Sequence, residues 1–299
     1  LRRVIDLYVR PEHEDLGKLA TSIDQIIAGS TIPHGVSVKL RGMVQGIPTK
    51  EPAFGLPALW VAEDQREQAQ MAGYTVVDAS SAITTHLSEI IKRHSHELLG
   101  RQEAQALLDE VGKTHPKLVE ELIPTMVSLG TVVRILGNLL KEGIPIRDIR
   151  SILEAVADHA MATKDPELLT EMARQSLART ITKQYQAPDG SLPVITLDPR
   201  LDRSLAEQAA TLPQGAMLNL DPALSHKLLT ALKQSAERVA ARGQQPILLC
   251  SPAVRRHLRR LTDRLLHSVP VVGLNEIDAM VRLQSMDTIR LDSELPQPS

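Results

Sequence analysis

Residues 51–110 have the sequence EPAFGLPALWVAEDQREQAQMAGYTVVDASSAITTHLSEIIKRHSHELLGRQEAQALLDE, which contains the only Phe and the only Trp of the 299-residue chain. The prolines and glycine in 51–57 exclude a regular helix, because proline removes a backbone donor and pushes the residue before it toward extended geometry. We therefore expect a rigid turn that presents Phe54. A short apolar strand at 58–61 and a helix at 64–71 follow from their compositions.

The second half of this stretch predicts another strand and a long helix. Residues 74–77 are aromatic or β-branched, which is typical of a strand. Ser80 or Ser81 can cap the following helix, which we expect to run from about residue 82 past Leu98. Its apolar residues recur at helical spacing, so one face of this helix should be buried.

C-terminal to this stretch, the pattern changes from helices alone to alternating strands and helices. Amphipathic helices separated by short turns between 116 and 179 predict a compact bundle of antiparallel neighbours. Beyond residue 186, predicted strands at 193–197, 246–250 and 269–274 alternate with helices, which indicates an α/β unit with a partly parallel sheet. We expect a helix-rich α+β protein with a small mixed α/β subdomain, a central helical bundle and a C-terminal α/β subdomain.

Composition narrows the functional classes. The net charge is −2, with 34 basic and 36 acidic residues, so no overall charge favours nucleic acid or an anionic membrane. The single Cys250 excludes an internal disulfide and fits a reducing compartment. No run of about 18 apolar residues is present, so we expect no membrane span within this chain. Because the chain opens at Leu1, we expect it to be a fragment of a longer protein.

The histidines at 86, 94 and 96 are the obvious metal candidates. His94 and His96 are two residues apart on a predicted helix, so they should point to different faces. His86 lies two turns before His94, too far for the two side chains to hold one ion without a further ligand. We therefore expect packing or solvated histidines and no metal site.

Residues of the kinds used in nucleophilic catalysis are present without the expected arrangement. Asp78, Ser81 and His86 supply the types of a catalytic triad, but no G-x-S-x-G elbow is present, and a triad is recognised by geometry. Cys250 lies in an apolar strand with no adjacent basic residue, which predicts a buried, inert thiol. No glycine-rich phosphate loop is present either. We expect no catalytic residues, no cofactor and no enzymatic activity.

A basic run, RRHLRR at 255–260, lies on a predicted helix. We expect a solvated helix face there, with contact to RNA or to an acidic partner as the alternative. The near-neutral overall charge favours the solvated face.

Long segments of the chain resemble one known family. These segments are PAFGLPALWV, REQAQMAGYTVVDASS, ITTHLSEIIKRHSHELLGRQEAQ, PKLVEELIP and IPIRDIRSILEAVADHA. Over about 46–291, the sequence resembles the C-terminal cytoplasmic domain of the FlhA family, the export-gate proteins of bacterial flagellar type III secretion. The resemblance implies a protein of the bacterial inner membrane, of which this portion is cytoplasmic and the transmembrane region lies outside this chain.

The resemblance also implies partners and a docking site. Family members form a nine-subunit ring, act with other export-apparatus proteins, and bind export chaperones that carry late substrates. Matched motif by motif, the chaperone pocket of the family falls on Glu51, Phe54 and Thr85, and Glu51 stands where many relatives have Asp. Tyr74 and Val76 are expected to line the same surface. The alternative for Phe54 is a ring that fills a core.

Residues 1–46 do not share this resemblance. They have a βαβ pattern, and RVIDLYVRPEHEDLGKLATSIDQIIAG with GVSVKLRGMVQ is similar to a periplasmic segment of RND-type efflux pumps. We therefore hypothesise a chimera, or an artefact of assembly, joined near Gly46 and Ile47. The alternative is a divergent family member whose first subdomain is also βαβ. The expected regions are 1–46, 47–98 with the chaperone groove, 99–185, 186–293 and a tail at 294–299.

Two other functions stay open at this point. One is an RND-type efflux transporter fragment, which rests on residues 1–46 alone. The other is an enzyme within the C-terminal α/β region, which would need a pocket where a carboxylate, a histidine and backbone amides converge.

Overall fold

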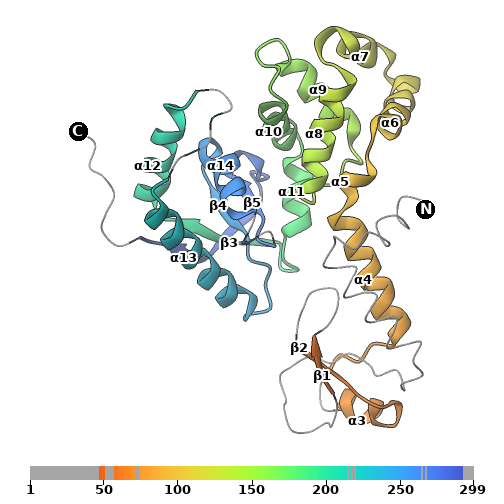
Figure 1. The fold of residues 1–299 in the computed structure, drawn as a ribbon, viewed down its shortest axis with the longest axis vertical. Coiled ribbons are helices and arrows are strands. Elements are labelled where there is room, and N and C mark those ends of the chain that lie inside the picture. Colours follow the sequence, from red (N-terminus) through yellow and green to blue (C-terminus); the bar gives the residue numbers. More distant parts are fainter. Residues whose placement is uncertain are drawn as a thin grey trace. The chain divides into compact units, whose positions relative to one another are not determined.

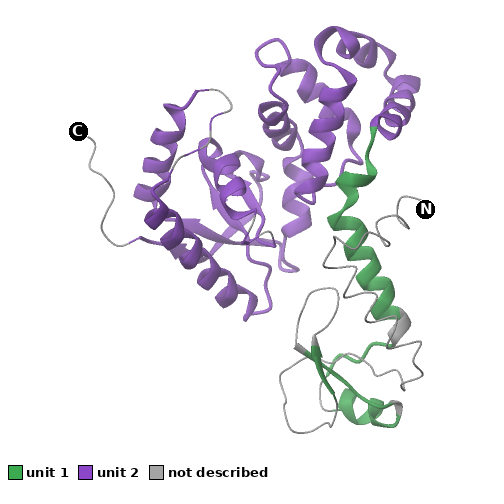
Figure 2. Ribbon diagram, viewed as in Figure 1, with its two compact units in different colours: residues 1–100 green, residues 101–299 purple. Residues whose placement is uncertain are grey.

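The computed structural model describes residues 47–50, 57–71, 74–213, 216, 218, 220–263, 265–266 and 268–291. The predictions for residues 1–46, for Glu51 and for Phe54 therefore lie outside the described residues. The chain forms two compact units, Leu1–Gly100 and Arg101–Ser299, which are coloured separately in Figure 2.

The first unit contains a small sheet with a short helix. Strand β1 (Ile47–Lys50) pairs antiparallel with β2 (Pro57–Trp60), and the chain continues through η2 (Glu63–Gln65) into α3 (Arg66–Met71). The core of this part contains Val61, Ala69 and Tyr74, with Leu59 and Val76 packed against it. The strand predicted at 74–77 is wrong in its extent, because only Val77 forms a strand-type bridge there.

Helix α4 (Ala79–Arg93) follows, and the short α5 (Ser95–Leu98) ends the unit. Asp78 caps α4, because its Oδ1 accepts a hydrogen bond of 2.7 Å from the backbone N–H of Ser81. The predicted caps Ser80 and Ser81 are thus wrong by two to three residues. The predicted continuous helix past Leu98 is also interrupted, since the backbone leaves helical geometry at His94.

The second unit begins with a group of helices, shown in yellow to green in Figure 1. Its elements are α6 (Arg101–Thr114), α7 (Pro116–Glu121), η3 (Leu122–Met126), α8 (Leu129–Lys141), α9 (Ile149–His159), α10 (Pro166–Ser176) and α11 (Ala178–Tyr185). Side-chain caps at Ser128, Asp148 and Asp165 start three of them, as such residues do at helix N-termini. Helix α10 packs against both α8 and α9, so these three form the centre of the bundle.

The remainder of the second unit is an α/β fold. Its elements are β3 (Ser191–Leu197), α12 (Pro199–Ala210), α13 (Pro222–Ala240), β4 (Leu248–Cys250), α14 (Pro252–Thr262), β5 (Val271–Gly273), η4 (Leu274–Glu276) and β6 (Arg282–Ile289). The strands form one parallel sheet in the order β5-β4-β3-β6. Alternate strand residues such as Ile195, Leu248 and Val271 share one core with α12, α13 and α14.

The prediction of a helix-rich α+β fold with small sheets is confirmed. Strand β6 was not predicted. Among the described residues, no single helix has the length and apolar character of a membrane span, although Pro116–Met126 and Leu129–Lys141, bent by 107°, pass that test as a pair.

Candidate functional site

The predicted docking residues have different surroundings in the first unit. Glu51 and Phe54 lie outside the described residues. Tyr74 is buried in the small core and Val76 packs against it, so both residues support the local fold. Thr85 is exposed on α4 and is not a member of that core. Among the described residues of the predicted set, Thr85 is therefore the one with the most exposed side chain, and Val76 is half-buried.

The histidine prediction is wrong in its geometry. Because the helix breaks at His94, the rings of His94 and His96 do not point apart but stack, with centroids 6.5 Å apart and planes inclined by 20°. Nδ1 of His94 lies 2.8 Å from Oε1 of Glu97. Within the described ranges, no group of three or more His, Cys, Asp or Glu residues is placed to hold a metal ion.

Cys250 and Asp78, which were considered as catalytic residues, both make contacts that support the fold. Cys250 is buried in β4, where its Sγ lies 3.8 Å from the carbonyl oxygen of Val272, and burial raises the pKa of this thiol. A thiol with a raised pKa is a poor nucleophile. The carboxylate of Asp78 accepts the α4 cap bond from Ser81. These contacts give Cys250 and Asp78 roles in the fold that require no catalytic function.

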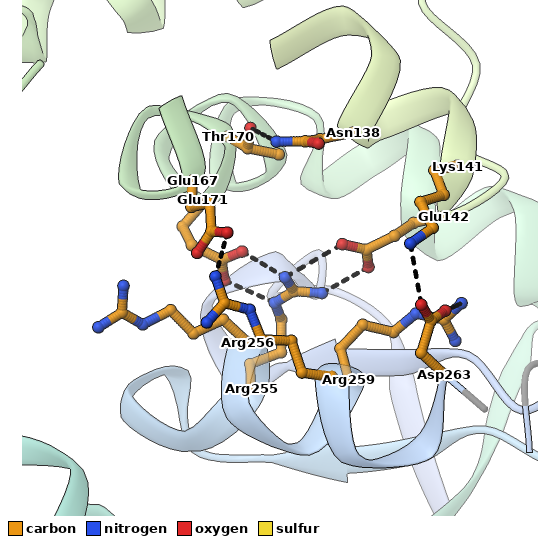
Figure 3. A pocket seen from close by; sticks show the side chains of 11 residues that line it. Asn138, Lys141, Glu142, Glu167, Thr170, Glu171, Arg255, Arg256, Arg259 and Asp263 are labelled. Carbon is orange, nitrogen blue, oxygen red and sulfur yellow. Dashed lines mark hydrogen bonds and ion pairs between the residues drawn. The ribbon is translucent and has the colours of Figure 1, made fainter. Parts of the chain in front are cut away.

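The most extensive polar cluster among the described residues lies in the second unit, where α8 and α10 face α14 (Figure 3). Arg174 on α10 makes a bidentate pair with Glu276, with bonds of 2.7 Å from Nε and 2.6 Å from Nη2. Its Nη1 donates to Glu142 at 2.9 Å. Only 3% of the Arg174 side chain and 2% of the Glu276 side chain are exposed, so this pair is fully removed from water.

Arg255 on α14 extends the same cluster. Its Nη1 donates to Oε2 of Glu142 at 2.6 Å, and its Nε and Nη2 form a bidentate pair with Glu171. Guanidinium groups suit such buried sites because their planar fork matches the carboxylate geometry. The cluster thus joins three separate helices and η4 through two buried arginines. We call these five residues, Glu142, Glu171, Arg174, Arg255 and Glu276, the buried ionic cluster.

The pKa values of two carboxylates in this cluster, Glu142 and Glu171, are shifted in opposite directions. Burial alone would raise the pKa of Glu142, but Arg174 and Arg255 outweigh it and hold the pKa at about 2. Burial dominates at Glu171 and raises the pKa of that carboxyl despite Arg255. The pKa of Arg255 is raised well above its usual range, because Glu142 and Glu171 together outweigh its own burial. Both arginines therefore stay charged, and their ion pairs connect α10 and α14 to η4 and to the end of α8.

The solvated face predicted for 255–260 is wrong at Arg255, of which only 2% is exposed. His257 is also buried, and Arg256, Arg259 and Arg260 are half-buried. The sequence near 255 held no indication of this burial, because the carboxylates that pair with Arg255 lie 84 and 113 residues away. A pocket of about 130 Å³ opens beside the cluster, between α8, α10 and α14 (Figure 3).

Comparison with protein families identifies the chain across most of its length. The model of the FHIPEP family matches residues 14–282. This match includes residues 14–46, the segment that was predicted to resemble an efflux pump, and its bounds span the predicted join near Gly46. The comparisons give no support to the efflux-transporter alternative.

The chain is similar to flagellar proteins in sequence. It is 40% identical over 267 residues to the flagellar biosynthesis protein FlhA of Bacillus subtilis, and this alignment covers 89% of the chain and 39% of FlhA. The chain thus spans about two fifths of the length of this relative.

Solved structures share the fold. CdsV of Chlamydia pneumoniae has a TM-score of 0.76 at 28% identity, with 86% of this chain and 75% of CdsV covered. The structure of CdsV with CdsO gives 0.74 at the same identity and coverage. Nonameric SctV-C from EPEC has a TM-score of 0.69 at 22% identity, over 87% of this chain and 78% of SctV-C, a likeness of fold alone.

Proposed function

Because the chain belongs to the FHIPEP family, we propose that it is the cytoplasmic part of a flagellar type III export gate and docks chaperone–substrate complexes for secretion. The observation that carries this proposal is the 40% identity to FlhA of B. subtilis over 267 residues. In this proposal the intact protein resides in the bacterial inner membrane. Its cytoplasmic part receives cargo and catalyses no bond chemistry.

The docking site in this proposal comprises Glu51 and Phe54, on the turn predicted from the sequence, together with the exposed Thr85. An aromatic ring beside polar contacts is a common centre of binding energy in protein interfaces. Tyr74 and Val76, which were predicted for the same surface, belong to or pack against the small core of the first unit. Flagellar export chaperones with their late substrates are the proposed partners.

Assembly into a nine-subunit ring is part of the same proposal. Its support is the nonameric arrangement of SctV-C, which shares this fold. The complex of CdsV with CdsO supports a second kind of partner, another protein of the export apparatus.

A secretion assay in the bacterium that carries the gene tests the proposal. The variant Thr85→Glu places a charge at the proposed docking surface, and Thr84→Glu is its control because both threonines are exposed on α4. We expect Thr85→Glu to reduce secreted filament protein several-fold at equal levels of the variant proteins, and Thr84→Glu to leave it near wild type. Equal secretion from both strains would remove Thr85 from the site.

A test of the gate function itself uses deletion of the gene. The strain should lose secretion of all late flagellar proteins, and the intact gene should restore it. Normal secretion in the deletion strain would contradict the proposed function as a whole.

A further inference from the structure

Every residue that lines the pocket beside the buried ionic cluster carries a polar or charged group. Its lining comprises charged side chains together with the amide of Asn138 and the hydroxyl of Thr170. Five lining residues are cations (Lys141, Arg255, Arg256, Arg259 and Arg260), and four are carboxylates (Glu142, Glu167, Glu171 and Asp263). An apolar ligand would displace water from these groups without replacing its hydrogen bonds, so this lining favours a polar or charged ligand.

All four carboxylates of the lining already form ion pairs with lysine or arginine side chains. Glu142 and Glu171 accept from Arg255, as described above. Glu167 pairs with Arg260. Asp263 accepts from Lys141 at 2.9 Å and from Arg259 at 3.0 Å. The pocket therefore has few acceptors to offer a cationic ligand.

Arg256 differs from the other four cations of the lining, each of which pairs with a carboxylate. Among the described residues no carboxylate lies within ion-pair distance of it, and its Nε donates only to Nε2 of His257, at 3.3 Å. Arg260 follows one helical turn later, so the two guanidinium groups lie on the same face of α14. Burial, followed by the charges of Arg256 and Arg260, lowers the pKa of His257, which fits a local excess of positive charge.

The size of the pocket limits the ligand further. The pocket has a volume of about 130 Å³. This space accommodates a single carboxylate or phosphate group. Donors in excess, acceptors already used and a small volume all indicate the same class of ligand.

We propose that this pocket is an oxyanion-binding site, in which Arg256 and the remaining donors of Arg260 hold a carboxylate or a phosphate group. The carboxylate would come from an acidic segment of another protein, and the phosphate from solution. All residues of the site lie in the second unit, whereas the proposed docking residues lie in the first. Failure of one proposal would therefore not contradict the other.

Titration of the 299-residue chain with sodium phosphate and, separately, with an acetylated tetraglutamate peptide tests the site. Binding is followed by calorimetry, with sodium chloride keeping the ionic strength constant, because surface charge effects vary with salt. The test variant is Arg256→Ala, and the control is Arg203→Ala, an exposed arginine on α12 outside the pocket. Arg256→Lys, which keeps the charge but loses the fork, provides a second variant if the alanine variant fails to fold.

We expect saturable binding of at least one probe, weakened about tenfold by Arg256→Ala, weakened less by Arg256→Lys, and unchanged by Arg203→Ala. Tighter binding of tetraglutamate would identify an acidic protein segment as the source of the oxyanion, and tighter binding of phosphate would identify the free ion. No saturable binding of either probe, or equal weakening by Arg203→Ala, would overturn the proposal.

Discussion

Arg174 is the residue whose surroundings leave the least room for substitution. Its side chain is almost fully buried and makes charge-assisted bonds to Glu276 and Glu142. Removing one partner of a buried ion pair is costly, because the other charge stays in a medium that solvates it poorly. Loss of the Arg174 side chain would therefore leave the carboxylates of Glu276 and Glu142 without one of their cationic partners.

We predict that Arg174→Ala destabilises the chain by about 3–5 kcal/mol, the range for breaking a buried pair. The matched control is Arg150→Ala, since Arg150 pairs with Glu154 on the exposed surface of α9 at 2.8 Å. Exposed pairs contribute only about 0–1 kcal/mol. Urea unfolding monitored by circular dichroism compares the two. Equal losses of stability would show that the cluster contributes no more than a surface pair.

Glu142 gives this cluster a defined dependence on acid. Its pKa in the folded chain is about 2, below the ordinary 4.5, so the folded state favours the ionised carboxylate. This contribution is present in full above pH 4.5 and is lost as the pH falls from 4.5 toward 2. A difference of this size corresponds to about 3 kcal/mol at most.

We predict that Glu142→Gln reduces the loss of stability between neutral pH and acid, because the variant has no proton to take up at that position. The control is Glu154→Gln on α9, a carboxylate outside the buried ionic cluster that pairs with the exposed Arg150. Thermal unfolding midpoints measured from pH 7 to pH 3 give the comparison. A Glu142→Gln profile parallel to wild type would contradict the assigned role of this carboxylate.

At the scale of elements, sequence patterns predicted the long periodic helices and the buried strands well. Helices α8, α9 and α10 have clear apolar stripes and capping residues, and β3 and β4 are short apolar runs. Such features depend on local chemistry, so they can be recognised without knowledge of the fold.

Strand β6 was missed for the opposite reason. Its sequence RLQSMDTI is mostly polar, and its first four residues are exposed. The strand exists because its backbone pairs with β3, and because Asp287 accepts hydrogen bonds from Ser235 and Arg238 on α13. Partners that lie 49 and 52 residues away leave no pattern in the strand itself.

The start of α4 allows a test at this scale. Asp78 caps the helix with its carboxylate, whereas Ser81 contributes its backbone N–H, which survives substitution. We predict that Asp78→Ala destabilises the first unit by about 1 kcal/mol and that Ser81→Ala has a much smaller effect. Hydrogen exchange of amides in α4 should show faster opening in the first variant only. Equal protection in both variants would exclude Asp78 as the effective cap.

At the scale of the whole molecule, the family was accessible from the sequence, but the buried ionic cluster was not. Segments such as ITTHLSEIIKRHSHELLGRQEAQ resemble FlhA directly, and the FHIPEP match over 14–282 confirms the family. The arginines of the cluster are bonded to carboxylates 32 to 113 residues away, a separation that no local pattern encodes. The predicted docking residues are a mixed case, because Thr85 is exposed, Tyr74 is buried, and Glu51 and Phe54 remain predictions.

In the proposed function, the aromatic side chain of Phe54, on the turn predicted from the sequence, binds export chaperones. Calorimetric titration of the 299-residue chain with a purified flagellar chaperone–substrate complex tests it most directly. The variant is Phe54→Ala, and the control is Met71→Ala, an exposed apolar residue on α3 of the same unit. We predict a loss of affinity of about tenfold or more for Phe54→Ala, as expected for a binding hot spot, and wild-type affinity for Met71→Ala. Unchanged affinity in a correctly folded Phe54→Ala chain would contradict the docking account.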